Sequence, residues 1–494
     1  MKKIVFVFII SVCLFGCENF LTRFPEDQLT SDNFYTSLAD YNKGLTGCYK
    51  TLQAIYNDAD ITGNGEIMSD DTREPGLGAW SDPYKMFLKT NSSSISGIWT
   101  NDYKMIYNCN AFLENLTKFS PKTAAETAEV KAMEGEAHFL RGLAYFNLVR
   151  YYGDVPKVTN TFAAPGESYG LGRTAVAKIY SDVIIPDFNL ATAQCYQKGA
   201  TQLKGQEARA TSGAALYFLA KAYLQQGDYA NAQTSLKKMI EDKQGGIFSL
   251  MTTYADVFDV SKKYNAESIL EAGFSIAAGQ PSNFFAHLGP DISTVMNVRN
   301  IVTGPAVYGS CNLLSDFSAS GEKDRFVATV DSGKVSYAVP PLQPFRQKFA
   351  PRSADYVKYL NTKTDYNFMI ARYADALLMY AECLWKSGNN TGALQYINQV
   401  RTRAKMAALP ANTTIDIDLI LHERRMELTF EAQRFFDLVR TGKAISVLSK
   451  FLRTKVGYDS PPVNNADIVA EQLLLPIPVS EIQKDPTLIQ NPGY

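Results

Sequence analysis

The chain has 494 residues, of which 49 are basic and 50 are acidic, so its formal net charge is -1. Because the sequence has neither a basic excess nor a basic run, it lacks the electrostatic footprint of a nucleic-acid-binding protein, and we exclude that partner. A chain of this length with 46% hydrophobic residues can bury a large core.

The N-terminus predicts an export signal. Lys2 and Lys3 precede an apolar run over residues 4–15, which ends at Gly16 and Cys17. This order is typical of a secretory signal peptide, and a run of this length is too short for a bilayer core of about 30 Å. The end of the run resembles the bacterial lipobox, which implies removal of residues 1–16 and acylation of Cys17. An ordinary secreted protein with an incidental cysteine is the alternative.

A loop-rich region follows from about residue 57 to residue 96, dense in Gly, Pro, Asp and aromatic residues. Long irregular segments in compact proteins are commonly functional. Trp80 and Tyr84 lie beside Gly and Pro, where aromatic rings can stack on a sugar or can simply pin the loop. Asp70 and Asp71 are expected to accept hydrogen bonds from hydroxyls or to be solvated, since sequence neighbours rarely have glycosidase geometry. With Arg73, these are the candidate ligand-binding residues.

Helical patterns dominate the rest of the chain, and two stretches share one frame. Ala220 is followed at offsets 3, 7, 12 and 16 by Tyr, Gly, Ala and Leu, and Ala381 is followed at the same offsets by Leu, Gly, Ala and Ile. This is the pattern of tetratricopeptide helix pairs, with small residues at the helix crossing and a glycine in the turn. It predicts pairs near 207–241 and 371–403, and a similar stretch predicts a third near 130–155. Because 161 positions separate the first two frames, a regular solenoid is not expected.

Helical spacing also places Trp99 and Trp385 in packing positions. A second loop-rich region, from about residue 273 to residue 365, contains many Gly and Pro residues between aromatic ones. The cysteines after Cys17 are an odd number at wide spacing, so we expect most of them to be small buried hydrophobic residues.

Motifs for catalysis are weak. GESYG at residues 166–170 matches G-x-S-x-G, but it lies in a polar, proline-bearing loop instead of the strand-to-helix turn that the motif needs. HERRM begins like a zinc-protease helix at His422, yet Met426 stands where the second histidine would be. We predict no catalytic residue, no metal site and no cofactor.

The segment from His422 to Gly442 interleaves acidic and basic residues with Leu and Phe. Opposite charges three or four positions apart stabilise a helix by about 0.2–0.5 kcal/mol per pair. We expect an amphipathic helix with a paired polar face, and partial burial of a charged network is the alternative.

The chain resembles the SusD/RagB family of nutrient-binding outer-membrane lipoproteins in six stretches that follow the family's order. They are FLTRFPEDQLTSDNFY, EAHFLRGLAYFNLVRYYGDVP, RYADALLMYAECL, INQVRTRA, ERRMELTFEAQRFFDLVR and LLLPIPVSEIQKDPTLIQNPGY.

The resemblance implies a mostly α-helical, single domain over residues 17–494, with tetratricopeptide-type helix pairs as scaffold and long irregular loops as the binding face. It implies non-catalytic capture of an oligosaccharide or polysaccharide at the cell surface and delivery to a SusC-like TonB-dependent outer-membrane barrel. It also implies attachment to the outer membrane through lipid on Cys17, facing the extracellular side. Capture of peptides for the same type of transporter is the alternative.

Overall fold

The computed structural model describes residues 34–57, 60–73, 86, 88–162, 164, 166–283, 308–331, 345–346, 348, 363–454 and 467–494. The fold is mostly α-helical, as predicted. In the described part of the chain no helix combines the length and the apolar character that a membrane span requires.

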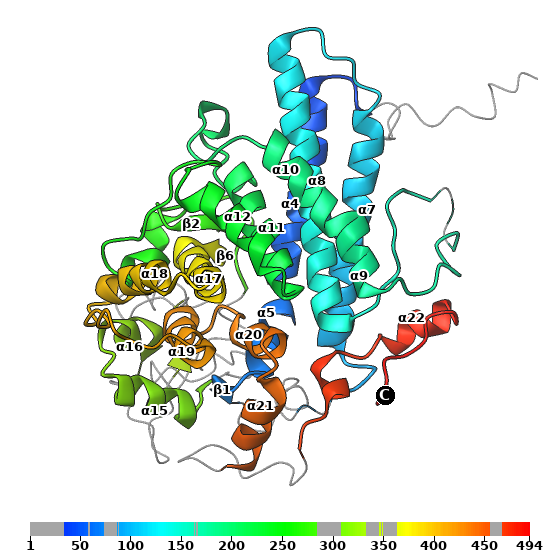
Figure 1. Ribbon diagram of the computed structural model, residues 1–494. Coiled ribbons are helices and arrows are strands. Elements are labelled where there is room, and N and C mark those ends of the chain that lie inside the picture. The colour runs from blue at the N-terminus through cyan, green and yellow to red at the C-terminus, as the bar shows by residue number, and fades with distance from the viewer. Residues whose placement is uncertain are drawn as a thin grey trace, which may run out of the picture.

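A row of long helices forms the scaffold, and each helix packs on the next one in the row. Figure 1 shows the row running from the long helices α7 and α8 to the shorter α17 and α18. Its members are α4 (Leu38–Asn57), α7 (Ser93–Leu116), α8 (Ala124–Tyr152), α10 (Ile185–Gln194), α11 (Ser212–Gln225), α12 (Tyr229–Ile240), α17 (Tyr373–Lys386) and α18 (Asn390–Arg403).

Two of the three predicted helix pairs are present as helical hairpins, α11 with α12 and α17 with α18. Gly227 and Gly388 occupy the turns at φ values of 74° and 82°, a backbone region that glycine adopts without steric cost. The next residue caps the second helix in both hairpins: the Asp228 carboxylate accepts from Asn231 N at 3.1 Å, and Asn389 Oδ1 accepts from Gly392 N at 2.9 Å. The shared spacing therefore correctly predicts the two helices of each hairpin and the glycine turn between them.

The two hairpins lie side by side, since α12 packs on α17. The two hairpins are therefore neighbours in the row although 161 positions separate their frames, and this single junction does not amount to the regular solenoid that the spacing argues against. The intervening chain leaves the row after α12 and returns through strand β6 (Phe368–Arg372), which pairs antiparallel with β2 (Ser268–Ala272) and leads directly into α17. An insertion can loop out of a helical row without separating its neighbours.

The third predicted pair is wrong, because residues 130–155 contain one helix only. α8 begins at a capping box between Thr123 and Glu126 and ends at Gly153, whose φ is 73°. Its neighbour α10 comes only after α9 (Val176–Ile179) and the π-helical turn η1 (Tyr180–Ile184). Pro186 follows that turn, and since proline donates no backbone hydrogen bond, the altered turn has a local cause.

The core is continuous along the row. Trp99 is 4% exposed and packs edge-on against Tyr152, with ring centroids 5.1 Å apart, so its predicted core position is confirmed. Trp385 is only partly buried against the same core. Cys48, Cys109, Cys195 and Cys383 are buried free thiols, as expected.

Shorter elements surround the row, and several of them lie within the regions expected to be loops. The helices are α5 (Asp60–Ile67), α15 (Cys311–Ser320), α16 (Asp324–Thr329), α19 (Ile417–Leu428), α20 (Arg434–Arg440), α21 (Ala444–Arg453) and α22 (Val479–Lys484), with 3-10 turns η2 (Thr201–Leu203), η3 (Ala255–Phe258), η4 (Val260–Lys262) and η6 (Ala470–Leu473). The expected loop regions are thus partly helical, because α5, α15 and α16 fall inside them.

Candidate functional site

The two loop-rich regions meet in one small antiparallel sheet. Strand β1 (Thr72–Arg73) of the first region pairs with β3 (Tyr308–Gly309) of the second, and β3 continues through β5 (Phe345–Arg346) to β4 (Val330–Asp331). Figure 1 places β1 and α15 at the end of the molecule opposite the tips of α7 and α8. We call this end, defined by β1, β3, β4, β5, α15 and α16, the loop-bearing end.

Asp70 and Asp71 directly precede β1 and are buried, with exposed fractions of 3% and 0%. Arg425 Nε lies 2.6 Å from Asp71 Oδ1, and Arg434 Nε lies 2.8 Å from Asp70 Oδ1. Carboxylates that are enclosed and paired in this way have no open face toward a ligand. The expectation that they contact hydroxyls or solvent is therefore corrected: they join the loop-bearing end to α19 and α20.

Burial and the arginines have opposite effects on the pKa values of this pair. Burial alone would raise the pKa of Asp70, but the charges of Arg425 and Arg434 outweigh burial and lower its pKa to about 2. For Asp71, burial together with the neighbouring charge of Asp70 exceeds the effect of Arg425 and raises its pKa. The pair shares two cations, which supports the ionised form of Asp70 in particular.

Arg425 also binds the second loop-rich region. Its guanidinium forms an ion pair with Asp316 of α15 and donates to Asn312 Oδ1 at 2.9 Å and to the Asp70 carbonyl at 3.0 Å. Ser310 donates its hydroxyl to that same carbonyl at 2.6 Å. One side chain of α19 therefore fixes both loop-rich regions relative to the helical row.

The remaining candidate residues are placed only in part. Arg73 lies in β1, with its backbone opposite Tyr308. Its side chain lies outside the described part of the structure, as do Trp80 and Tyr84. Arg73, Trp80 and Tyr84 follow Asp71 in the sequence by 2, 9 and 13 positions, and they remain candidates.

The charged segment after His422 differs from the expected exposed helix. It is broken into α19 and α20 at residues 429–433, where Phe430 and Ala432 have φ values of 65° and 55°. Its charges are buried in a network instead of facing solvent, so the alternative of a buried charged network is the observed one. The buried members from this segment are Glu423, Arg424, Arg425, Glu427, Glu431 and Asp437.

Arg372 is at the centre of this network and is fully buried. Its guanidinium lies 2.8 Å from Glu267 and 2.7 Å from Glu431, and it donates to the Glu427 carbonyl at 2.7 Å. Lys348, from the second loop-rich region, donates to the Thr429 carbonyl at 2.8 Å and pairs with Glu431. The lysine satisfies the free carbonyl groups at the end of α19, and its positive charge is favourable there.

An open groove of about 460 Å³ lies away from the loop-bearing end. Its volume lies within the usual range for ligand pockets, and two of its polar side chains are engaged with the protein backbone. Gln53 donates to the Gly273 carbonyl, and Tyr49 accepts from Ala210 N at 2.7 Å. The groove is lined by Asn42, Lys43, Leu45, Thr46, Gly47, Tyr49, Lys50, Leu52, Gln53, Gln206, Ala208, Arg209, Glu271, Ala272, Gly273 and Gln280.

The motifs that resemble catalytic ones lie in unsuitable places. Ser168 of GESYG is in a turn, with no strand before it. His422 Nε2 lies 3.0 Å from Ser320 Oγ, and the next turn of the helix presents buried Met426. Within the described ranges, no group of three or more His, Cys, Asp or Glu side chains is arranged to hold a metal ion.

The fold and the paired loop segments define a class: helical scaffolds that present a loop-built face at one end. Two family models match the sequence, "Starch-binding associating with outer membrane" over residues 22–224 and "SusD family" over residues 324–494. The chain belongs to the SusD/RagB family.

Full-length relatives agree with this assignment. The SusD-like protein P25 of Formosa agariphila is 28% identical, with 99% of each chain covered. A solved laminarin-binding SusD-like protein is 26% identical and superposes with a TM-score of 0.76, covering 93% of this chain and all of that one. Surface glycan-binding protein A of Bacteroides uniformis has the same fold. It is 24% identical and superposes with a TM-score of 0.78, covering 92% of this chain and 99% of its own. The two solved structures are named as binding proteins.

Proposed function

We propose that this protein captures oligosaccharides or polysaccharides at the outer face of the outer membrane and delivers them to a SusC-like TonB-dependent barrel. The observation that carries the proposal is the full-length likeness to a laminarin-binding SusD-like protein at 26% identity. Non-catalytic binding agrees with the weakness of every catalytic motif in the sequence. Peptide capture for the same kind of transporter remains the second candidate from the sequence.

The proposed ligand face is the loop-bearing end, and Trp80, Tyr84 and Arg73 are its proposed contact residues. Two independent segments are joined there by β1 and β3, and Arg425 anchors both to α19. A face built in this way has a rigid base, which reduces the entropy that a bound ligand must remove from the loops. Aromatic rings on such a base can stack on the apolar faces of sugar rings.

The first test is binding to a panel of glycans and peptides, measured by calorimetry, with laminarin as the first glycan. We expect a glycan to bind and peptides to fail. Trp80→Ala or Tyr84→Ala should weaken that binding about tenfold or more, the loss of about 1.4 kcal/mol expected when one good stacking contact is removed.

Tyr107→Ala is the matched control, because Tyr107 lies on α7, is 55% exposed and is remote from the loop-bearing end. Wild-type affinity in both loop variants would overturn the site assignment and leave capture itself intact. Binding of peptides and of no glycan would replace the main proposal by the second candidate.

The proposed anchor is lipid on Cys17, which lies outside the described residues. Incorporation of labelled palmitate should be abolished in Cys17→Ala. Label in that variant would contradict the anchor without bearing on ligand capture. The barrel partner should copurify with the wild-type protein from solubilised outer membranes.

A further inference from the structure

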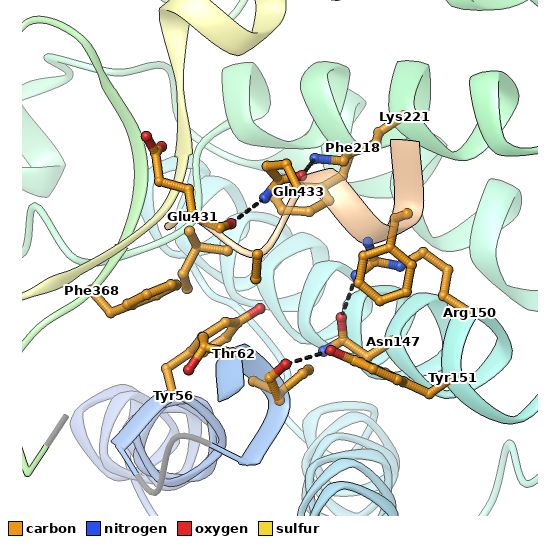
Figure 2. Close-up of a pocket in the computed structure, with 14 residues that line it drawn as sticks. Tyr56, Thr62, Asn147, Arg150, Tyr151, Phe218, Lys221, Phe368, Glu431 and Gln433 are labelled. Atoms are coloured by element: carbon orange, nitrogen blue, oxygen red, sulfur yellow. Dashed lines mark hydrogen bonds between the residues drawn. The ribbon is translucent and has the colours of Figure 1, made fainter. Parts of the chain in front are cut away.

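A small cavity of about 30 Å³ lies where α8, α11 and the break between α19 and α20 meet. Figure 2 shows Arg150 and Asn147 on one side of it, Lys221 and Gln433 on another, and Tyr56 opposite. A cavity needs about 10–15 Å³ to hold one water molecule, so this one has room for one small ion or for water, and no room for a sugar.

Arg150 is unusual among the cations of this region, because it has only neutral partners. Its guanidinium donates to the Phe146 carbonyl at 3.3 Å and to Asn147 Oδ1 at 3.0 Å. The rings of Phe146 and Phe436 pack on the guanidinium, with their centroids 4.2 and 4.1 Å from Arg150 Cζ. No carboxylate of the described residues forms an ion pair with it.

Its neighbours show the opposite pattern. Arg424 lies 2.6 Å from Asp375, and Arg440 lies 2.8 Å from Asp437. Lys221, which also lines the cavity, lies 3.1 Å from Asp375. An arginine cannot lose its proton in a protein, so a largely enclosed guanidinium without a counter-charge is costly.

Two carboxylates near the cavity are engaged with other groups. Glu431 lines the cavity, but its carboxylate is paired with Lys348 and Arg372. Asp102 lies behind Asn147, which donates to it at 3.2 Å, and burial raises the pKa of Asp102 well above its ordinary value. Asp102 is thus hydrogen-bonded to Asn147 and forms no ion pair with Arg150.

The cavity also presents hydrogen-bond donors. Burial raises the pKa of Tyr56, so its hydroxyl keeps its proton at neutral pH. The Gln433 amide donates one hydrogen bond to the Glu431 carbonyl at 2.7 Å, and a second N–H remains on the same nitrogen. Lys221 adds positive charge on the same side, and burial lowers its pKa only to about 8.

We propose that this cavity binds a small monovalent anion, with chloride as the ion to test, held by the guanidinium of Arg150 together with the hydroxyl of Tyr56 and the amide of Gln433. The ion supplies a direct counter-charge, which Arg150 does not receive from any ion pair with the described residues. It joins α8 to the segment 429–433, whose neighbour Arg434 reaches the base of the loop-bearing end through Asp70. Binding of the ion therefore stabilises the base of the face independently of any sugar.

The experiment uses bromide as a heavy substitute for chloride. Crystals of the wild-type protein grown in bromide should show an anomalous peak in the cavity beside Arg150. In solution, replacing gluconate by chloride at constant ionic strength should raise the melting temperature in a saturable way.

Arg150→Met retains an apolar stem between the two phenylalanine rings and should abolish both the peak and the chloride-dependent shift. Arg173→Met is the matched control, because Arg173 binds carbonyl groups of Tyr152, Asp154 and Ile489 and should leave the shift unchanged. The proposal is overturned by a wild-type cavity that holds water only, with equal melting temperatures in the two salts. It is equally overturned if Arg150→Met keeps the chloride shift.

Discussion

Arg425 illustrates how one buried side chain can organise a binding face. It lies 355 positions from Asp70 in sequence, yet it contacts that residue, Asp71 and Asp316. A buried ion pair recovers its desolvation cost only when the remaining polar atoms are also bonded. The guanidinium meets this condition through Asn312 and the Asp70 carbonyl.

Arg425→Met should destabilise the protein by about 3–5 kcal/mol, because it leaves buried carboxylates without their shared cation. The loss should appear as a lower urea midpoint in equilibrium unfolding. Arg453→Met provides the control, since Arg453 and Asp467 form a largely exposed ion pair and should contribute little. Equal losses of unfolding free energy in the two variants would show that Arg425 contributes no more to stability than an exposed arginine.

At the scale of elements, the sequence predicts what is encoded locally. The hairpins α11–α12 and α17–α18 follow from small residues at fixed offsets and a glycine in each turn. The break between α19 and α20 does not, because it depends on distant partners: the Glu66 carboxylate accepts from Ala432 N, and Lys348 binds the Thr429 carbonyl. The sequence shows where the charged residues are, but it does not show which distant residues pair with them in the folded protein.

The same distinction explains the outcome for the candidate site. The two loop-rich regions were found by composition, and the sheet β1–β3 does bring them together. The chemistry of Asp70 and Asp71 makes them candidates, but their partners Arg425 and Arg434 are far away in the sequence. A polar residue in a loop can serve the fold or the ligand, and only its partners distinguish the two roles.

The turn glycines allow a test in which one substitution has opposite effects. Gly388→Ala forces a left-handed backbone on a residue with a Cβ and should cost about 1–2 kcal/mol, although no atom lies within 4 Å of the new methyl group. Gly47→Ala, in the exposed middle of α4, also meets no neighbour and should stabilise by about 0.5–1 kcal/mol. Urea unfolding of both variants measures the difference. A stabilised Gly388→Ala would contradict the conformational role of the turn.

At the scale of the whole molecule, buried ion pairs connect the loop-bearing end with the helical row. Arg325 of α16 lies 2.7 Å from Glu423 of α19, and Arg403 of α18 lies 2.6 Å from Glu267 beside β2. Elements that are far apart in the sequence are therefore held together by ion pairs as well as by apolar packing. Such a network makes the stability of the protein depend on pH.

Stability should fall as the pH drops below about 4. Burial would raise the pKa of Glu427, but Arg403, Arg372 and Arg325 outweigh it and lower the pKa to about 2, while Asp70 also has a pKa of about 2. Unfolded carboxyl groups have pKa values of about 4, so these two groups contribute their full stabilisation above that value and lose it as the pH falls toward 2. Burial raises the pKa of Glu136 and Glu271, so these groups act in the opposite direction, but their effect is complete once the pH lies well below the ordinary carboxyl pKa of about 4. Urea midpoints at a series of pH values measure how steeply stability depends on pH. Glu427→Gln should reduce this dependence. Asp418→Asn is the control and should leave it unchanged, because Asp418 forms a largely exposed ion pair with Lys443. A wild-type midpoint that stays constant below pH 4, or an equal slope in Glu427→Gln, would mean that the buried carboxylates do not keep their charge in the folded protein.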